Sequence, residues 1–473
     1  MATTEPIGAP EAEILCCVLV ITREAQREVL LLEKETQYCL PSIQIPRKER
    51  RATHINEAVR RLWGIEGVCL FAAAAAPGSD SSGAKRCYVL EARSFDCACH
   101  KDAFWMCIRD LRPERRLRVE DADTLMSALA EAEAFQAGEN VPNFVRSGWF
   151  EEVTAWVQQQ VSHYGWLLSE RWTQYTMGPD FSLIRFETTG PAVWFKAANR
   201  REFAISLALA EMESAYLPRQ LAESSSWRGW LMADAVGLRL DECDSLRAWT
   251  TAASSLSALQ IESVGNIEAL IAAGCHDCRT PELERMIDPF IAAVAELMTA
   301  QTHSPPRILT DSDLATVAAH LREGCALLGA LPIPSCLGHG DLNAGNIIVE
   351  GQKAVFLDWA SAMVGHPFFS GEYLLALFCR LHPDRSVWTD AIRAAYLFPW
   401  RRFCPAGAIE QSFAWMPLVA PFAWALRLWT AESRSGGTDV YTARLLRSVS
   451  RRIYDETILL PRKVSVSNFE ERR

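Results

Sequence analysis

Four side chains that could carry out phosphoryl chemistry lie within twenty residues of one another. His339 and Asp341 are followed by Asn346, and an apolar run then ends in Asp358. A carboxylate can accept the proton of a hydroxyl group, and amide and carboxylate oxygens are ligands that hard divalent cations prefer. Side chains of these types could therefore remove the proton of a hydroxyl group and hold a divalent cation nearby, as phosphoryl transfer requires.

The spacing of these residues is part of the prediction. The asparagine comes five residues after the first aspartate, so the chain can turn back and hold a metal ion beside it. The second aspartate follows a short apolar strand, where it can hold the metal ions that bridge the nucleotide phosphates. Positioning and neutralisation of charge provide most of the catalysis in such reactions.

The residues before this motif predict a strand-rich region. Residues 182–187 and 192–197 read as two strands joined at 188–190 by a hairpin signal, and residues 177–180 as the turn before them. Residues 201–217 read as a helix that ends before a proline.

The remainder of the chain has a different pattern. Residues 230–232 form a short predicted strand, whereas residues 245–454 read as mostly helical, interrupted only at about 337–358. A strand-rich part followed by a helical part predicts an α+β fold with two lobes.

The segment from His339 to Asp358 resembles the catalytic loop of the aminoglycoside phosphotransferase-like kinases, a family that includes choline and homoserine kinase relatives. That loop is H-G-D-x-x-x-x-N, followed by an apolar strand ending in Asp, and every fixed position is matched. The resemblance spans roughly residues 166–454. It implies a bilobal protein kinase-like fold, ATP and Mg²⁺ as cofactors, and a small-molecule hydroxyl compound as acceptor.

The resemblance also implies roles for individual residues. Asp341 would be the catalytic base, and His339 would organise the loop. Asn346 and Asp358 would be the Mg²⁺ ligands.

In the strand-rich lobe the resemblance implies a nucleotide site. Lys196 falls where the family places the lysine that holds the α- and β-phosphates, and Glu202 would orient it, with Glu211 as the alternative. The loop over the phosphates would be Met177–Ser182, which includes Gly178 and Ser182.

The segment Trp230–Ala233, which contains Met232, would contact adenine.

The N-terminal part resembles the Nudix hydrolase fold. Strands at 13–21 and 29–32, a Leu-Pro entry and a helix over 56–63 that stops at Gly64 fit its layout. Arg61 and Leu62 stand where the family has its pair of metal-binding glutamates, and neither can bind a hard cation. Glu49 matches the first glutamate of the Nudix motif, whereas Ile43, Glu57 and Ala58 depart from it. A small mixed α/β domain without Nudix catalysis is predicted.

These interpretations divide the chain into four parts. They are a Nudix-like domain at 11–145, a connector helix at 146–164, a kinase-like small lobe at 165–244 and a helical large lobe at 245–462.

Composition and net charge limit the kinds of binding partner that we expect. The net charge of −10 gives no reason to expect nucleic acid or an anionic membrane as a partner. No stretch is long and apolar enough for a spanning helix, and the first residues lack a secretory signal, so a cytoplasmic location is predicted. The oligomeric state stays open.

Two local groups have spacing that resembles zinc sites. Cys275 and Cys278 form one, and Cys97, Cys99 and His100 form the other. Neither group has a matching second half nearby, so both are interpreted as structural.

Two other functions compete with phosphoryl transfer. The first is a catalytically inactive nucleotide-binding or scaffolding protein, which the altered Nudix helix motivates. The second is a Nudix pyrophosphohydrolase with a metal site rebuilt from Glu49, Glu57 and Glu66. The acidic residues Asp241, Glu242 and Asp244 could favour a cationic acceptor or could be plain surface.

Overall fold

The computed structural model divides the chain into two units, each described here by itself. The first comprises Met1–Phe203 and Gln220–Asp234, and the second comprises Ala204–Arg219 and Ala235–Arg473. The residues described are 14–21, 28–34, 37–45, 50–73, 86–95, 102–110, 117–138, 142–178, 180–434 and 439–470.

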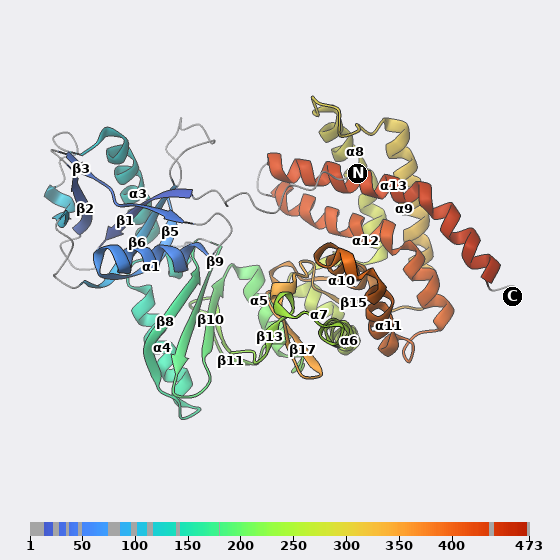
Figure 1. Cartoon of the computed structure of the whole chain (residues 1–473), viewed down its shortest axis with the longest axis horizontal. Coiled ribbons are helices and arrows are strands. Elements are labelled where there is room, and N and C mark those ends of the chain that lie inside the picture. Colours follow the sequence, from blue (N-terminus) through green and yellow to red (C-terminus); the bar gives the residue numbers. More distant parts are fainter. Residues whose placement is uncertain are drawn as a thin grey trace. The chain divides into compact units, whose positions relative to one another are not determined.

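The N-terminal part of the first unit is a mixed sheet covered by helices (Figure 1). Strands β1 and β6 pair in parallel, and the other strand pairs are antiparallel. Helix α1 ends at Gly64, which has the left-handed φ of 68° that glycine adopts freely. The elements are β1 (Ile14–Ile21), β2 (Glu28–Lys34), β3 (Gln37–Cys39), β4 (Ser42–Ile45), α1 (Arg51–Trp63), β5 (Ile65–Ala72), β6 (Arg86–Phe95), β7 (Ala103–Cys107) and α3 (Val119–Ala137).

Both faces of this sheet are covered, which explains the continuous apolar run of β1. Val18 and Val20 belong to the core cluster that also contains residues of α1, whereas Leu19 and Ile21 belong to a second cluster on the opposite face. Successive side chains of a strand point to opposite faces, so a strand covered on both sides has no polar alternation.

The second sheet of the first unit is antiparallel throughout, in the order β11-β12-β10-β9-β8. The predicted hairpin at 188–190 connects β9 and β10. The strands are β8 (Leu168–Thr176), β9 (Phe181–Thr188), β10 (Val193–Ala198), β11 (Gln220–Ser224) and β12 (Gly229–Ala233).

Helix α4 (Trp149–Ser162) links the cores of the two sheets. The Phe150 ring lies 4.5 Å from that of Trp172 and 6.0 Å from that of Phe186, measured between centroids. At the start of the helix the amide of Gly148 donates to the buried carboxylate of Glu91 at 2.8 Å. One apolar cluster contains residues of the first sheet, of α4 and of the second sheet, so α4 is an integral part of the core of this unit.

Helix α5 (Arg200–Ala210) is shorter than the sequence predicts. The expected helix to residue 217 is wrong, because the chain beyond Ala210 uses its backbone groups elsewhere. The amide of Tyr216 donates to the hydroxyl of Ser214, and its carbonyl accepts from the amide of Phe356 at 2.9 Å.

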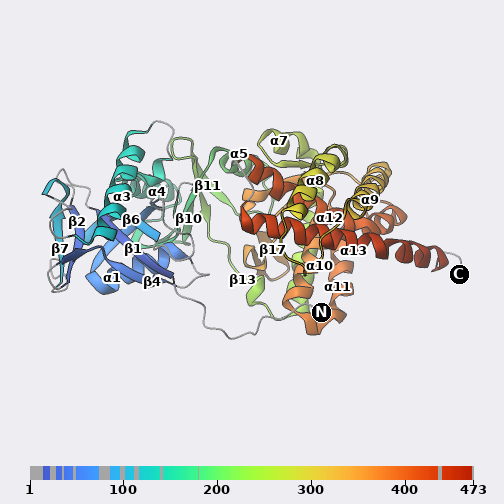
Figure 2. The same cartoon turned by 90° about the horizontal axis from the view of Figure 1, so that it is seen from above.

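The second unit is mainly helical. Helices α12 and α13 lie side by side, as do α8 and α9 (Figures 1 and 2). Its helices are α6 (Leu246–Ser263), α7 (Ile267–Ala272), α8 (Thr280–Thr299), α9 (Asp311–Ala330), α10 (Phe368–Leu381), α11 (Thr389–Trp400), α12 (Ala406–Arg434) and α13 (Val440–Glu470). Its strands are β13 (Leu238–Arg239), β14 (His276–Cys278), β15 (Cys336–Gly338), β16 (Ile347–Glu350), β17 (Lys353–Phe356) and β18 (Met363–Gly365).

The expectation of a single interruption in the helical region is wrong in detail. β14 and β18 lie outside residues 337–358 and pair with each other in parallel, and β15 pairs with β18. These strands have only three residues each, which is too short to give a periodic pattern in the sequence.

The cysteine pair at 275 and 278 lies at this small sheet. Both side chains are buried, and burial raises the pKa of the Cys278 thiol to about 12. A thiol with this pKa is protonated at neutral pH. The other predicted group, Cys97, Cys99 and His100, lies outside the described residues.

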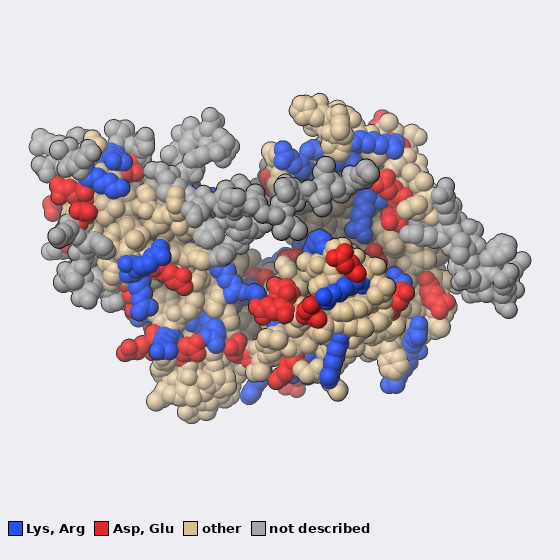
Figure 3. Space-filling view, viewed as in Figure 1, with Lys and Arg blue, Asp and Glu red and all other residues tan. Residues whose placement is uncertain are grey.

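Neither sign of charge dominates the face of the molecule that Figure 3 shows. On the face in view, lysine and arginine side chains are interspersed with aspartate and glutamate (Figure 3). Among the described residues, no helix is long and apolar enough to cross a membrane.

His366 is buried and packs against the rings of Phe368 and Phe369. Its Nδ1 accepts from the amide of Phe368 at 3.3 Å, and burial lowers the pKa of this imidazole to about 3. Because the unfolded chain binds a proton near pH 6.5 that the folded chain excludes, this residue makes folding less favourable as pH falls below that value.

We predict that this imidazole costs about 1.4 kcal/mol of the free energy of unfolding between pH 7.5 and pH 5.5. His366→Asn retains an acceptor but does not titrate, so its pH-dependent loss should be smaller by that amount. Urea denaturation of both proteins at the two pH values measures this. An equal loss in both would show that His366 does not titrate on unfolding.

Candidate active site

A buried histidine fixes the start of the loop predicted to be catalytic. His339 follows β15 and is 0% exposed, and its Nε2 lies 2.7 Å from the carbonyl oxygen of Leu357. Since a carbonyl can only accept, Nε2 carries the proton. Burial lowers the pKa of His339, which favours the neutral imidazole. Its ring also contacts that of Trp359, 4.5 Å away.

Gly340 is required by the path of the chain. Its φ is 72°, and a Cβ at this position would lie 2.0 Å from the carbonyl oxygen of Ser361. A side chain is therefore excluded by both the backbone conformation and the neighbouring backbone. The next residue, Asp341, is exposed.

A hairpin brings Asn346 close to Asp358 along the chain path. Strands β16 and β17 pair with Ile347 opposite Phe356, and the carbonyl of Asn346 accepts from the amide of Leu357 at 2.8 Å. Asp358 is the next residue and has a left-handed φ of 61°, which is uncommon for aspartate and is found often at functional sites.

The chemistry of this donor set fits Mg²⁺. Asn346 supplies an amide oxygen and Asp358 an exposed carboxylate, both hard oxygen ligands. Among the described residues no group of three or more His, Cys, Asp or Glu side chains could hold a metal ion by itself. Magnesium commonly binds through one or two protein oxygens and substrate phosphates, so a sparse protein site is compatible with it.

The predicted phosphate-binding lysine lies in the first unit. Lys196 on β10 is 7% exposed, and its Nζ lies 2.5 Å from Oε1 of Glu202 on α5. The side chain of Asn199 accepts from the amide of Glu202 at 3.0 Å and so caps the helix. The structure pairs Lys196 with Glu202, whereas Glu211, the alternative, lies beyond the end of α5.

The remaining predicted nucleotide contacts also lie in the first unit. Gly178 has a φ of 135° and open space where a side chain would stand. Ser182 is 1% exposed, and its hydroxyl lies 3.4 Å from the carbonyl of Thr176. Met232 lies on β12, opposite Trp194 on β10.

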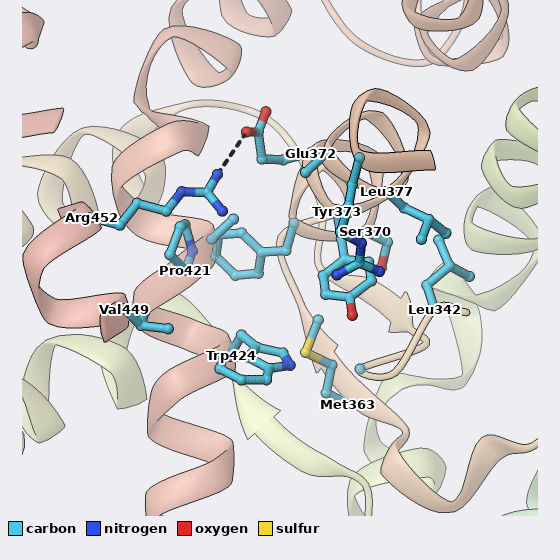
Figure 4. A pocket seen from close by; sticks show the side chains of 15 residues that line it. Leu342, Met363, Ser370, Glu372, Tyr373, Leu377, Pro421, Trp424, Val449 and Arg452 are labelled. Atoms are coloured by element: carbon cyan, nitrogen blue, oxygen red, sulfur yellow. Dashed lines mark ion pairs between the residues drawn. The ribbon is translucent and has the colours of Figure 1, made fainter. Parts of the chain in front are cut away.

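A pocket in the second unit adjoins the loop predicted to be catalytic (Figure 4). It has a volume of about 400 Å³, and its lining includes Gly340 and Leu342, the two neighbours of Asp341 in the sequence. Helices α10, α12 and α13 and strand β18 supply most of the wall. The other lining residues are Met363, Phe369, Ser370, Glu372, Tyr373, Ala376, Leu377, Arg380, Ala420, Pro421, Trp424, Val449 and Arg452. Sequence motifs did not identify these residues, because no local spacing marks side chains that three separate helices bring together.

The negative charge of Asp341 affects the pKa values of two residues on the neighbouring helices. Burial raises the pKa of Tyr373, and the negative charge of Asp341 raises it further. Burial lowers the pKa of Arg427 on α12, and Asp341 opposes that effect. Arg427 also donates to the hydroxyl of Ser361 at 3.0 Å. These residues place one positive charge and one phenol in the electrostatic surroundings of the predicted base.

The acidic residues considered for a cationic acceptor are paired with arginines. Arg239 lies 3.3 Å from Asp241 and 2.8 Å from Glu242, and Arg385 binds Asp244 at 2.9 Å. None of the three carboxylates lines the pocket.

Comparison with known proteins identifies the central part of the chain. Residues 184–405 match the model described as "Phosphotransferase enzyme family". This match includes Lys196, Glu202 and the whole segment from His339 to Asp358, and it does not reach the N-terminal sheet. The Nudix-like assignment of that sheet therefore stays a prediction. No curated protein matches the chain.

Solved structures with similarity to the chain include three small-molecule kinases. Macrolide 2'-phosphotransferase MphH from Brachybacterium faecium is 16% identical, with a TM-score of 0.41, and the match covers 64% of this chain and 98% of that one. Plasmodium vivax ethanolamine kinase is 13% identical (TM-score 0.44; coverage 64% and 91%). Choline kinase LicA from Streptococcus pneumoniae is 14% identical (TM-score 0.41; coverage 64% and 99%).

We predict that Gly340→Ala destabilises the protein more than Gly351→Ala. Both glycines have positive φ, but a Cβ at Gly351 meets nothing within 4 Å. Gly351→Ala should therefore cost only the backbone strain of about 1 kcal/mol, and Gly340→Ala at least about 2 kcal/mol more. Urea denaturation measures both. Equal losses would mean that the close approach of Ser361 imposes no constraint.

Proposed function

We propose that this chain, whose residues 184–405 belong to the phosphotransferase enzyme family, transfers a phosphoryl group from ATP to a hydroxyl group of a small molecule. The observation that carries the proposal is the loop from His339 to Asp358. It has an exposed carboxylate beside a pocket, and the residues at the adjoining ends of two paired strands would hold the metal ion.

Asp341 is proposed to act as the base. It would accept the proton of the acceptor hydroxyl as the oxygen attacks the terminal phosphorus of ATP. The P–O bond to the leaving ADP breaks as the new bond forms, so ADP and a phosphate ester are the products. The pocket beside Asp341 would hold the acceptor with its hydroxyl toward this carboxylate.

Asn346 and Asp358 would hold Mg²⁺, which supplies neutralisation of the phosphate charge when bound. The hydrogen bond between Leu357 and Asn346 fixes the spacing of these two ligands. His339 would act through Leu357, since its imidazole holds the residue that precedes Asp358.

Lys196 would bind the α- and β-phosphates of ATP. Its pairing with Glu202 in a buried setting limits the directions in which the ammonium can point. A fixed cation stabilises developing charge more effectively than a flexible one, because little reorganisation is needed during the reaction.

The N-terminal sheet is proposed to lack Nudix catalysis. Arg61 and Leu62 are exposed on α1, and Glu57 on the same helix is exposed as well. Glu49 lies outside the described residues. An arginine and a leucine supply no oxygen ligands, so the inactive-module interpretation of this domain is favoured over a pyrophosphohydrolase. The cytoplasmic location stays a prediction.

We predict that Asp341→Ala lowers acceptor-dependent ADP release by about 10²–10⁴-fold, as expected for loss of a general base. The affinity for Mg-ATP should change by less than about threefold, because the proposed nucleotide contacts remain. A panel of aminoglycosides and metabolite alcohols supplies the acceptors, and calorimetry measures nucleotide binding.

Asp384→Ala is the matched control, since it removes an exposed carboxylate of the same unit that lies outside the loop and the pocket. Equal turnover in Asp341→Ala and the wild-type protein would disprove the proposed mechanism. Mg-ATP binding without transfer to any acceptor would favour the inactive nucleotide-binding protein.

A further inference from the structure

The acceptor pocket has an apolar interior. Tyr373 on α10, Trp424 on α12 and Met363 on β18 face one another across it (Figure 4). Phe369 and Leu377 extend the apolar wall. A pocket of this size and lining removes most of the surface of a bound ring system from water, which favours an acceptor with an apolar body.

The charged residues of the pocket have an excess of positive charge. Its lining contains two arginines, Arg380 and Arg452, and one carboxylate, Glu372. Glu372 already lies 3.7 Å from Arg452, and the side chains are 17% and 51% exposed (Figure 4). Arg380 is exposed, so both guanidinium groups can reach a ligand from the solvent side.

A polycationic acceptor does not suit this arrangement. It would bring further positive charge beside two arginines. Glu372, the one carboxylate among the lining residues, lies 3.7 Å from Arg452, and the neighbouring Asp341 is proposed to face the reacting hydroxyl. Removing a cation from water without a free anionic partner is unfavourable. An anionic group at the mouth would instead pair with Arg380 or Arg452.

We propose that the acceptor is an amphiphilic alcohol with an apolar ring body and an anionic group. The ring body would fill the space between Tyr373 and Trp424, and the anionic group would lie at Arg380 and Arg452. The proposal that the ligand is a phosphate acceptor rests on the proposed function. The preference of the pocket for an anionic ligand can be measured by binding alone.

Three alcohols with one body and different charges test it. They are 4'-(hydroxymethyl)biphenyl-4-carboxylate, the uncharged 4-(hydroxymethyl)biphenyl, and the analogue with a 4'-trimethylammonium group. Calorimetry with the full-length protein should give the tightest binding for the carboxylate, at least about tenfold tighter than for the ammonium compound, with the neutral alcohol between them.

Variants of the pocket residues test whether Arg380 causes the preference for the carboxylate. Arg380→Glu should remove or reverse the preference for the carboxylate, whereas Arg402→Glu makes the same charge change at an exposed residue outside the pocket and should leave it intact. Trp424→Ala should weaken all three compounds. Circular dichroism of each variant shows that it is folded.

Binding of the ammonium compound as tight as that of the carboxylate overturns this proposal, as does absence of binding by all three. A preference that Arg402→Glu abolishes as fully as Arg380→Glu also overturns it. ADP release is measured separately with ATP present. The expected order of binding without ATP turnover by any alcohol would support the pocket chemistry and count against phosphoryl transfer.

A second inference concerns the strand that leads into the loop Met177–Ser182. The side chain of Gln174 on β8 is 1% exposed, and its amide forms hydrogen bonds with the N-terminal sheet and with α1. Its Oε1 accepts from the amide of Cys69 at 2.8 Å and from Asn56 at 3.2 Å, and its Nε2 donates to the carbonyl of Cys69 at 2.8 Å.

The neighbouring residues make contacts with the same part of the chain. The hydroxyl of Thr53 on α1 donates to the carbonyl of Gln174 at 2.8 Å, and Arg50 lies 4.3 Å from the centre of the Tyr175 ring. Met177 packs against the apolar cluster formed by α1 and its sheet. Residues 174, 175 and 177 are therefore held by the N-terminal domain immediately before the loop.

We infer that the N-terminal domain positions the loop Met177–Ser182 and thereby sets the affinity for ATP. Gln174 is a positioning residue in this arrangement. Its role in nucleotide binding rests on the proposed function, whereas its effect on the loop does not.

Gln174→Met tests this inference, with Gln158→Met as the matched control. Gln158 on α4 accepts from the amide of Leu168 at 2.8 Å, at the other end of the same strand. Gln174→Met should speed hydrogen exchange of the loop amides and raise the Kd for Mg-ATP about three- to tenfold, while the Kd for the biphenyl carboxylate stays unchanged. Gln158→Met should leave both loop exchange and ATP affinity near the wild-type values.

Equal loop exchange in the two variants overturns the inference, and so does a parallel loss of ATP and acceptor affinity in Gln174→Met. Failure of the wild-type protein to bind Mg-ATP would count against the proposed function. It would leave the inference about the loop testable, because the hydrogen-exchange comparison requires no nucleotide.

Discussion

The geometry of the candidate site depends on one buried hydrogen bond, from the imidazole of His339 to the carbonyl of Leu357. Burial of an unpaired polar group is costly, so this bond restricts the ring to one orientation. It joins two segments that are 18 residues apart in the sequence. Through it the start of the loop, which carries Asp341, is held against the residue that precedes Asp358.

The β16–β17 hairpin completes this constraint from the other side. In its register the amide of Leu357 donates to the carbonyl of Asn346. Leu357 therefore uses its amide to bind Asn346 and its carbonyl to bind His339. Gly340 allows the turn between His339 and Asp341, since no side chain fits beside Ser361. These backbone contacts define where the chain carries the carboxylates of Asp341 and Asp358.

The first unit applies the same principle to a different segment. Gln174 is a buried amide whose donor and acceptor groups are satisfied by the backbone of Cys69 and by Asn56. Such fully satisfied networks define one arrangement, because any shift leaves a buried polar group unpaired. The N-terminal sheet and helix therefore hold the strand that leads into residue 177.

The sequence by itself was enough to predict a catalytic loop, because His339, Asp341, Asn346 and Asp358 match a motif of fixed spacing within one short segment. It also predicted the longer strands and helices, whose periodicity extends over enough residues to be read. Only the tertiary structure decided the short strands β14 and β18, the early end of α5, the pairing of Lys196 with Glu202 rather than Glu211, and the pocket beside Asp341. The physical reason is that these features depend on contacts between segments far apart in the chain, such as α10 with α12 and α13, and no local pattern records such contacts.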